Sequence, residues 1–331
     1  MQSQNKIRWG IIGLGNIAQK FATDLLTIED AQLYAVASRT QESANTFAKK
    51  YNAIKAYGSY EDLANDPNVD AVYIATPHVF HMEHTLMCLD KGIAVLCEKP
   101  FAMNIHEVET MIAKAIEKNV LLMEALWTYF LPHYQYVLEF LKTEEFGNII
   151  KIEADFGFNR AVDPAHRLFS KQLGGGSLLD IGIYPIFVAL STLGTPSKIE
   201  AAAKYFDTGA DSVCDMEFTY TNGAKAFLKS TLLKDTPTSA TIYCEKGEIV
   251  INSKFFMPST VTLKYMDGTE KTIDDFGYKT LGYNYEAIHF NQLLREGKKQ
   301  SPIMSFDFSR KLISLLDRTR EKIGLVYTSF N

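Results

Sequence analysis

Short, continuous apolar runs alternate with amphipathic stretches along the first part of the chain. Such runs indicate strands buried on both faces, as in a parallel sheet, while the stretches between them have the period of helices. This alternation predicts an α/β domain with a doubly wound parallel sheet. The expected strands are residues 7–12, 33–37, 71–75, 93–97 and 120–124, with a helix at 105–118.

After residue 125 the pattern changes to strict alternation. Residues 151–158 place Ile152, Ala154, Phe156 and Phe158 on one face and Lys151, Glu153 and Asp155 on the other, as in a half-covered strand. We therefore predict two domains: a dinucleotide-binding Rossmann domain at 1–125 and a substrate-binding and dimerisation α+β domain at 126–331.

Three hairpin turns support a large, mostly antiparallel open sheet in the second domain. Asn222-Gly223, Lys246-Gly247 and Asp267-Gly268 each join two β-type runs, and glycine supplies the positive φ that such turns need. Helices can cover one face of this sheet, which leaves the other for a second subunit. We expect a homodimer through that open face. The chain should end in an amphipathic helix at 306–323.

Composition narrows the class of protein. The 331 residues are 47% hydrophobic and 22% charged, with a formal net charge of −5 and no basic block, which argues against nucleic acid as a partner. No apolar run approaches the roughly 20 residues of a membrane span. The four cysteines are far apart, so we expect packing roles in a reduced, soluble, cytoplasmic protein.

A glycine-rich loop follows the first expected strand. Gly13, Gly15 and Ala18 form G-x-G-x-x-A between a strand and a helix, with Asn16 and Ile17 at the helix start. The glycines permit a tight turn and close approach of the backbone to a pyrophosphate, and the free amides of the helix start attract phosphate. The loop therefore predicts a dinucleotide site.

The second strand ends in Ser38-Arg39, where sites that prefer NAD usually place an acidic residue. A hydroxyl and a guanidinium suit a 2′-phosphate, and a charge-assisted hydrogen bond contributes roughly 1.5–3 kcal/mol. We predict NADP rather than NAD as the cofactor, with a merely solvated arginine as the alternative.

The next strand ends in Thr76-Pro77-His78, with His81 and His84 following on a helix. Three close histidines suggest a metal, but their spacing lacks the i, i+4 pair of a zinc helix and no acidic or cysteine cluster completes a site. We expect no metal. His78 is interpreted as a neighbour of the cofactor and His81 as a helix-entry or packing residue.

The strand at 93–97 ends in Glu98-Lys99-Pro100. Proline stops the strand and keeps Lys99 out of the helical region. Lys99 then lies at the carboxyl end of a buried strand, where open α/β sheets bind ligands. Gly13, Ser38, Thr76 and Glu124 also close expected strands, so the sequence places all of them on one edge of the sheet.

In the second domain, three glycines at 174–176 precede Ser177, which can cap a helix. Asp180 and Tyr184 are four residues apart, so a helix would stack them on one face. Gly182 and Pro185 should kink or loosen that helix. The alternative is a packing helix with a solvent-facing pair.

These motifs, in this order, resemble the Gfo/Idh/MocA oxidoreductase family. The Ala37-Ser38-Arg39 and Glu124-Ala125-Leu126-Trp127-Thr128 segments are similar to its branch of dimeric dihydrodiol dehydrogenases and NADP-dependent xylose dehydrogenases. The resemblance implies hydride transfer between NAD(P) and a carbon of a sugar or diol, with the substrate between the Rossmann domain and the open sheet.

The resemblance also implies roles for particular residues. Lys99 and Tyr184 would be catalytic, with Asp180 one helical turn before the tyrosine. The cofactor would contact Gly13, Gly15, Asn16, Ile17, Ala18, Ser38, Arg39, Thr76, Pro77, His78, Glu98 and Lys99. The substrate pocket would include Trp127, Tyr129, Phe158, Asp180 and Tyr184. Related dihydrodiol enzymes commonly have arginine where this chain has Tyr129, so the substrate itself stays open.

Alcohol oxidation requires removal of a hydroxyl proton as hydride leaves carbon. A free tyrosine has a pKa of about 10, and a lysine cation nearby favours the phenolate. We therefore expect Tyr184 as acid and base, Lys99 as its electrostatic partner and Asp180 as a partner of a substrate hydroxyl or of the lysine. Alternatively, Lys99 donates the proton and Tyr184 orients the substrate.

Two other functions remain open at this stage. One is an NAD(P)-using glycosidase of the same fold, against which the Ser38-Arg39 signal for a dissociable NADP argues. The other is a non-catalytic NADPH-binding sensor, which could lose Lys99 or Tyr184, whereas this chain retains both.

Overall fold

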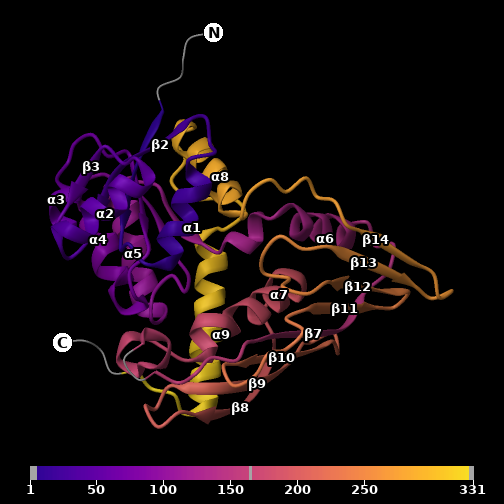
Figure 1. Ribbon diagram of the computed structural model, residues 1–331. Helices are drawn as coiled ribbons and strands as arrows, with labels where there is room; N and C mark the ends of the chain where they lie inside the picture. Colours follow the sequence, from indigo (N-terminus) through magenta and orange to yellow (C-terminus); the bar gives the residue numbers. More distant parts are fainter. Residues whose placement is uncertain (1–5, 164–165, 328–331) are drawn as a thin grey trace. The chain divides into compact units, whose positions relative to one another are not determined.

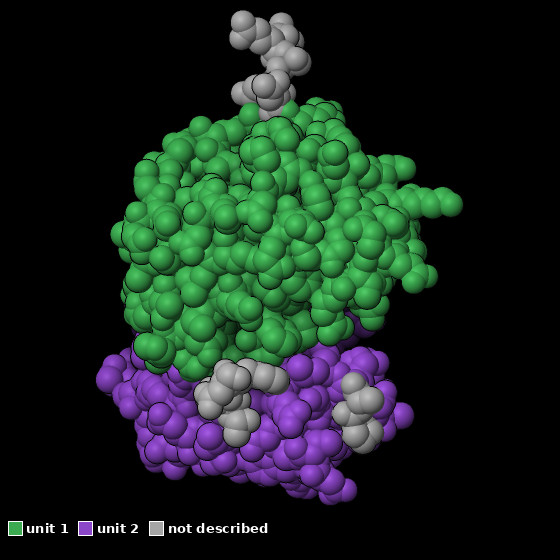
Figure 2. Space-filling model, turned by 90° about the vertical axis from the view of Figure 1, so that its left-hand side faces the viewer, with its two compact units in different colours: residues 1–127, 279–310 green, residues 128–278, 311–331 purple. Residues whose placement is uncertain are grey.

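The chain divides into two compact units. In the computed structural model, residues 6–163 and 166–327 are described. One unit comprises Met1–Trp127 and Lys279–Arg310, and the other Thr128–Tyr278 and Lys311–Asn331 (Figure 2). Residues 279–310, which the sequence analysis placed in the second domain, therefore cluster with the first unit.

The first unit contains the predicted doubly wound parallel sheet (Figure 1). Its strand order is β3-β2-β1-β4-β5-β6, and every neighbouring pair is parallel. The strands are β1 (Ile7–Ile12), β2 (Ala31–Ala37), β3 (Lys55–Tyr57), β4 (Ala71–Ile74), β5 (Ala94–Glu98) and β6 (Leu122–Ala125). The helices are α1 (Asn16–Leu25), α2 (Gln41–Tyr51), α3 (Tyr60–Ala64), α4 (His81–Asp90), α5 (Ile105–Lys118) and α8 (Tyr283–Arg295).

The burial of the central strands explains their uninterrupted apolar runs. Every residue of β4, β5 and β6 is buried, as expected for strands covered on both faces. The strand order reverses between β1 and β4, and ligands of open α/β sheets bind at the carboxyl ends of strands at such a switch point. The loops after these two strands therefore define the expected nucleotide site.

Helix α8 joins the first unit through polar contacts that are distant in sequence. The indole nitrogen of Trp9 in β1 donates to Asn291 Oδ1 over 3.0 Å. Asp24, near the end of α1, accepts the backbone amides of Leu281 at 3.1 Å and Tyr283 at 2.8 Å. A carboxylate at these amides stabilises the start of α8, where helix N–H groups lack intrahelical partners.

The second unit contains the large sheet that the hairpins predict. Its order is β14-β13-β12-β11-β7-β10-β9-β8. The strands are β7 (Ile149–Gly157), β8 (Lys198–Tyr205), β9 (Asp211–Thr219), β10 (Lys225–Thr231), β11 (Ala240–Cys244), β12 (Gly247–Ile251), β13 (Val261–Tyr265) and β14 (Glu270–Ile273). Strand β10 pairs parallel with β7, and the other neighbours are antiparallel, so the fold class predicted from sequence is confirmed.

The two faces of this sheet differ as the alternation predicts. Ile152, Ala154 and Phe156 of β7 are buried, whereas Glu153 is exposed. Helix α7 (Ile183–Leu193) contacts β7 and β10 on the buried side (Figure 1). The remaining helices are α6 (Pro132–Lys142) and α9 (Phe306–Ile323), and the division between the units falls inside α9.

Residues 171–193 include one stretch that is long and apolar enough to resemble a membrane span. In that window 94% of the residues are buried inside the protein, as in a core helix of a globular domain. All four cysteines are free and buried, in keeping with packing roles.

Candidate active site

The glycine loop has the geometry that a dinucleotide requires. Gly13 has a φ of +88°, and a Cβ there would lie 2.8 Å from the backbone of Ala75, so a larger residue would collide with the loop after β4. No atom lies within 4 Å of the position that a Cβ would take at Gly15. Helix α1 begins at Asn16 without a side-chain cap, which leaves its first amides available to phosphate. The loop fits a pyrophosphate.

Ser38 and Arg39 follow β2 directly, as predicted. Arg39 is exposed and Ser38 is half-buried, while Thr40 caps α2 through its hydroxyl, which accepts the Ser43 amide. Burial raises the pKa of Tyr60 and the charge of Arg39 opposes this, which places the guanidinium near α3. An exposed cation at this strand end fits the 2′-phosphate of NADP better than the uncharged ribose hydroxyls of NAD.

Thr76 and its histidines form a compact cluster. The Thr76 hydroxyl lies 3.0 Å from His84 Nδ1. His81 is fully buried, with Nε2 2.9 Å from the Thr76 carbonyl and Nδ1 2.9 Å from the Pro100 carbonyl. His81 thus connects the loop after β4 to the loop after β5, a structural role for a residue that the sequence analysis interpreted as a packing histidine.

Lys99 follows β5 among buried carboxyl groups. Glu98 Oε2 accepts the Lys99 amide over 3.1 Å, and its Oε1 accepts the Tyr73 hydroxyl. Glu124 is fully buried and its Oε1 accepts the Phe101 amide over 3.0 Å. Burial raises the pKa of Glu124 to about 7, and the charge of Lys99 partly opposes the rise. Lys99 therefore lies at the end of the strand, as predicted, and buried carboxyl groups lie near its backbone.

Trp127 stacks on a partner that the sequence does not reveal. Its ring lies 4.1 Å from that of Tyr283, with an interplanar angle of 2°. Tyr283 is the first residue of α8, and Asp24 holds its amide. Because the two residues are more than 150 positions apart, no local pattern could have paired them.

In the second unit, backbone packing explains the three glycines at 174–176. Gly174 has a φ of +74°. A Cβ at Gly175 would lie 2.3 Å from the Arg167 carbonyl oxygen. Gly176 has a φ of +124°, and its Cβ would lie 2.1 Å from Asp211 Oδ1. Glycine is therefore required at 175 and 176 by the close approach of two other segments.

The segment after the glycines differs from the expected helix. Leu178–Gly182 is a π-helix, and α7 starts only at Ile183. The α-helical spacing that would stack Asp180 directly on Tyr184 therefore does not apply. Pro185 lacks an amide to bond the preceding turn, which favours the wider turn, and such π segments occur frequently at functional sites. Ser177 is not the helix cap, because its hydroxyl donates to Asp211 instead.

Asp180 and Tyr184 occupy different surroundings within this unit. Asp180 Oδ1 lies 3.1 Å from Arg167 Nη1, an ion pair that the sequence analysis missed. The Tyr184 ring packs against Phe156 and Phe256, at 5.6 and 5.3 Å between centroids. An acid paired with a half-exposed arginine can bind hydroxyls, while the phenol has an aromatic support.

The other two predicted pocket residues also lie in the second unit. Tyr129 packs edge-on against Phe187, with 5.1 Å between ring centroids, and burial raises the pKa of its phenol. Phe158 follows β7 and lies 6.3 Å from Phe156. Among residues 6–163 and 166–327, no group of three or more histidine, cysteine or acidic side chains is arranged to hold a metal ion.

The structure therefore gathers the predicted residues into two sets. The first unit brings together the glycine loop, Ser38, Arg39, Thr76, Pro77, His78, Glu98 and Lys99 at the carboxyl ends of its strands, with Trp127 after β6. The second unit contains Tyr129, Phe158, Asp180 and Tyr184. The doubly wound parallel sheet and its glycine loop define a dinucleotide-binding protein.

Comparisons with known proteins agree with this class. Residues 7–126 match the oxidoreductase family with an NAD-binding Rossmann fold, and residues 134–250 match the GFO/IDH/MocA C-terminal domain. The chain belongs to the Gfo/Idh/MocA oxidoreductase family.

Full-length relatives include trans-1,2-dihydrobenzene-1,2-diol dehydrogenases. The protein from Xenopus tropicalis is 38% identical, and the alignment covers 97% of this chain and 99% of that protein. The human protein is 33% identical, with 97% and 98% covered.

Solved structures share the fold over nearly the whole chain. The 3-ketoreductase KijD10 from Actinomadura kijaniata, solved with NADP and TDP-benzene, has a TM-score of 0.87 and 25% identity, with 96% and 98% of the two chains covered. The aldose-aldose oxidoreductase from Caulobacter crescentus, solved with glycerol, has a TM-score of 0.87, 22% identity and coverage of 96% and 97%. The second likeness concerns the fold alone.

Proposed function

We propose that the protein is an NADP-dependent dehydrogenase that transfers hydride between the nicotinamide and a hydroxyl-bearing carbon of an aldopyranose sugar or a trans-dihydrodiol. The observation that carries this proposal is the similarity to trans-dihydrodiol dehydrogenases, up to 38% identity over 97% of the chain. KijD10, a 3-ketoreductase solved with NADP that is 25% identical to this chain, supports an oxidoreductase of the same type.

NADP is the proposed cofactor. The open glycine loop accepts a pyrophosphate, and the exposed Arg39 beside Ser38 suits a 2′-phosphate. KijD10 was solved with NADP. The residues proposed to hold the cofactor are Gly13, Gly15, Asn16, Ile17, Ala18, Ser38, Arg39, Thr76, Pro77, His78, Glu98 and Lys99.

When bound, the cofactor supplies the hydride acceptor or donor. Tyr184 would take the hydroxyl proton during oxidation and return it during reduction. The Lys99 cation would favour the phenolate, and positioned proton transfer of this kind contributes about 10²–10⁴-fold. Asp180, oriented by Arg167, would hold a substrate hydroxyl. Trp127, Tyr129 and Phe158 would form the apolar part of the pocket.

Lys99 as the immediate proton donor is the competing assignment. Crystallised variants of KijD10 replace a tyrosine by phenylalanine or a lysine by alanine, the same two residue types. The pH–rate profiles of Lys99→Met and Tyr184→Phe separate the two roles, because the proton donor's variant loses the limb that belongs to its ionisation.

The proposed function is tested by following absorbance of reduced nicotinamide. The purified protein is assayed with NADP and with NAD against aldopyranoses, inositols and trans-dihydrodiols. We expect reduction of NADP with at least one sugar or dihydrodiol and a lower kcat/KM with NAD. Absence of cofactor reduction across the whole panel would contradict the dehydrogenase proposal. Release of nitrophenol from nitrophenyl glycosides without net cofactor reduction would indicate a glycosidase instead.

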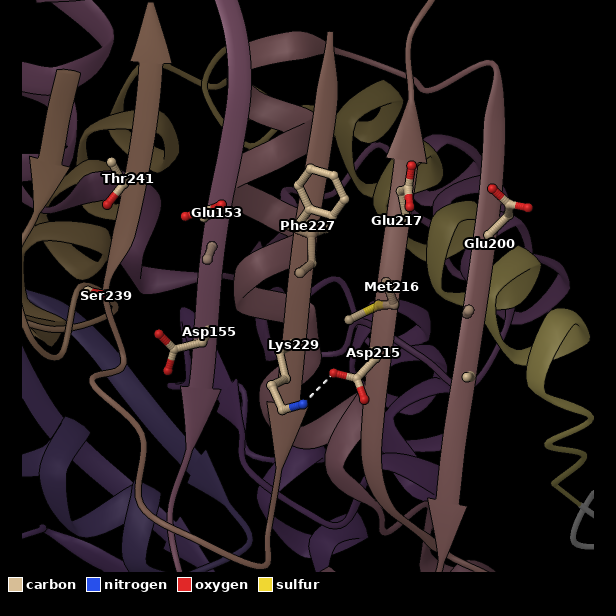
Figure 3. Close-up of a pocket in the computed structure, with 14 residues that line it drawn as sticks. Glu153, Asp155, Glu200, Asp215, Met216, Glu217, Phe227, Lys229, Ser239 and Thr241 are labelled. Carbon is tan, nitrogen blue, oxygen red and sulfur yellow. Dashed lines mark hydrogen bonds and ion pairs between the residues drawn. The ribbon is translucent and has the colours of Figure 1, made fainter. Parts of the chain in front are cut away.

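We also propose a homodimer through the exposed face of the second unit's sheet. That face carries a shallow depression of about 590 Å³, over strands β7, β9 and β10 (Figure 3). Phe227 is 40% exposed at its centre, among ion pairs such as Lys229 with Asp215. An apolar residue with paired charges around it is typical of an interface.

Light scattering at micromolar concentration tests the dimer. We expect twice the chain mass for the wild type and a monomer for Phe227→Arg. Ile116→Arg is the control, since Ile116 is 64% exposed in the first unit. A monomeric wild type would overturn this proposal.

Finally, we propose a cytoplasmic location. The four cysteines are free and buried, as is usual in proteins of a reducing compartment. Cell fractionation tests the location, and recovery in a secreted fraction would contradict it.

A further inference from the structure

Asp211, the first residue of β9, is a buried acid that none of the proposed roles uses. Its side chain is fully buried, and it lies against the segment that carries Asp180 and precedes Tyr184. Removing a carboxylate from water is costly unless hydrogen bonds compensate. Its contacts therefore indicate a specific role.

Those contacts converge on the first turn of the π-helix. Asp211 Oδ2 accepts the Ser177 hydroxyl at 2.7 Å and the Leu178 amide at 2.7 Å. Leu178 is the first residue of the π-helix, whose initial amides have no partner within the helix. A carboxylate at this position also interacts favourably with the positive end of the helix dipole. Asp211 is thus a helix cap supplied by a strand.

The adjacent strand packs along the same segment. The Ser230 hydroxyl of β10 lies 3.0 Å from the Ser177 hydroxyl, and its Oγ lies 3.0 Å from the position that a Cβ would take at Gly182. Two neighbouring strands therefore meet at Ser177, directly before the five-residue π-helix, and one of them packs against the last residue of that helix. Asp180 lies within the π-helix, and Tyr184 is the second residue after it.

Gly176 provides independent evidence that the approach of Asp211 is specific. Its backbone lies so close that a Cβ would reach within 2.1 Å of Asp211 Oδ1, and that oxygen has no hydrogen-bond partner among the described residues. Gly176 therefore combines a φ of +124° with close approach to a carboxylate oxygen of Asp211, an arrangement that a residue with a Cβ could not adopt. Burial raises the pKa of this carboxyl to about 6, and the hydrogen bonds from Ser177 and Leu178 oppose the rise.

We propose that Asp211 is a positioning residue for hydride transfer: by holding Ser177 and Leu178, it sets where Asp180 and Tyr184 lie. This inference rests on the proposed function for those two residues. Asp211 touches neither reacting group. Its loss should misplace them without affecting cofactor binding, because the glycine loop belongs to the other unit.

The test compares Asp211→Asn with Asp207→Asn in the full-length protein. Asp207 lies in the turn before the same strand and is exposed, so its substitution controls for charge. For Asp211→Asn we expect kcat to fall at least about tenfold. The dissociation constant of NADPH, measured by fluorescence, should stay within about twofold. The primary deuterium isotope effect on kcat should rise, because misplaced groups slow the chemical step, whereas a change in stability alone would not move it.

Hydrogen exchange at residues 177–182 gives a readout that does not depend on activity. We expect faster exchange in Asp211→Asn and not in Asp207→Asn. Ser177→Ala removes one of the two donors, so it should show a smaller change in the same direction. If Asp211→Asn does not fold, hydrogen exchange in Ser177→Ala decides whether this contact holds the segment.

The outcomes separate this inference from the function on which it rests. If Tyr184→Phe loses activity while Asp211→Asn keeps the kcat, isotope effect and exchange of the wild type, the positioning role is wrong. If Tyr184→Phe keeps wild-type kcat, the proposed catalytic role of Tyr184 fails, and the exchange data alone then decide whether Asp211 holds the segment.

Discussion

Arg167 donates a hydrogen bond to Asp180, with 3.1 Å between Nη1 and Oδ1. The pair matters because Asp180 is the residue proposed to hold a substrate hydroxyl. An arginine that fixes the carboxylate orients both of its oxygens, and charge-assisted hydrogen bonds are stronger than neutral ones.

Arg167→Gln should therefore impair substrate use. We expect kcat/KM for the sugar or diol to fall about tenfold, the lower end of the range for a charged hydrogen bond because Arg167 is half-exposed. Steady-state kinetics measure this, with Arg160→Gln as an exposed control. An unchanged kcat/KM would show that Asp180 needs no arginine.

Arg39→Ala should discriminate between the two nicotinamide cofactors. Losing one charged contact to a 2′-phosphate predicts a KM for NADP that is about 10- to 100-fold higher, while the KM for NAD stays nearly constant. Lys49→Ala on α2 is a matched control, since Lys49 is also an exposed cation. Equal effects on both cofactors would place Arg39 outside the phosphate site.

Glu124 should make stability depend on pH. Burial raises its pKa from 4.5 to about 7. The protonated carboxyl therefore contributes fully to the free energy of unfolding below about pH 4.5, and this contribution is lost as the pH rises through about 7. Glu124→Gln removes this loss and should raise the free energy of unfolding by about 2–3 kcal/mol at pH 8, with little change at pH 5. Urea unfolding at both pH values measures the difference, with the exposed Glu83→Gln as control. A gain of equal size at pH 5 would contradict the assignment.

His133 should make stability depend on pH in the sense opposite to Glu124. It is buried, its Nε2 lies 3.0 Å from the Phe255 carbonyl, and burial lowers its pKa to about 4. Its neutral form contributes stability above about pH 6.5, which is lost as pH falls toward 4. His133→Gln should flatten this acid limb in thermal unfolding curves measured between pH 7 and 4.5. A limb of unchanged slope would assign the acid sensitivity to other groups.

Much of the fold could be predicted because its signals are local. Strand β1 and helix α5 coincide with the expected bounds, and β13 and β14 lie on either side of the expected turn at Asp267-Gly268, since apolar period and turn glycines act within a few residues. The parallel pairing of β7 with β10 could not be read in this way, because it joins strands about 70 residues apart. The same holds for α8, which only its contacts assign to the first unit.

The same distinction between local signals and distant contacts applies to the candidate site. Gly13, Lys99 and Tyr184 lie in motifs, so sequence alone could propose them. Arg167, Asp211 and Tyr283 act through contacts with distant residues and carry no local signal. The loosened helix expected around Gly182 and Pro185 is present as a π-helix, a form that the sequence alone did not specify.

The kcat of Tyr184→Phe tests the central claim most directly. It is compared with Tyr220→Phe, whose buried hydroxyl has no partner among the described residues, so its loss should leave kcat unchanged. With NADP and the best substrate of the panel, we expect Tyr184→Phe to lower kcat at least about 100-fold while NADPH still binds. A kcat close to that of Tyr220→Phe would contradict the assignment of the catalytic acid and base.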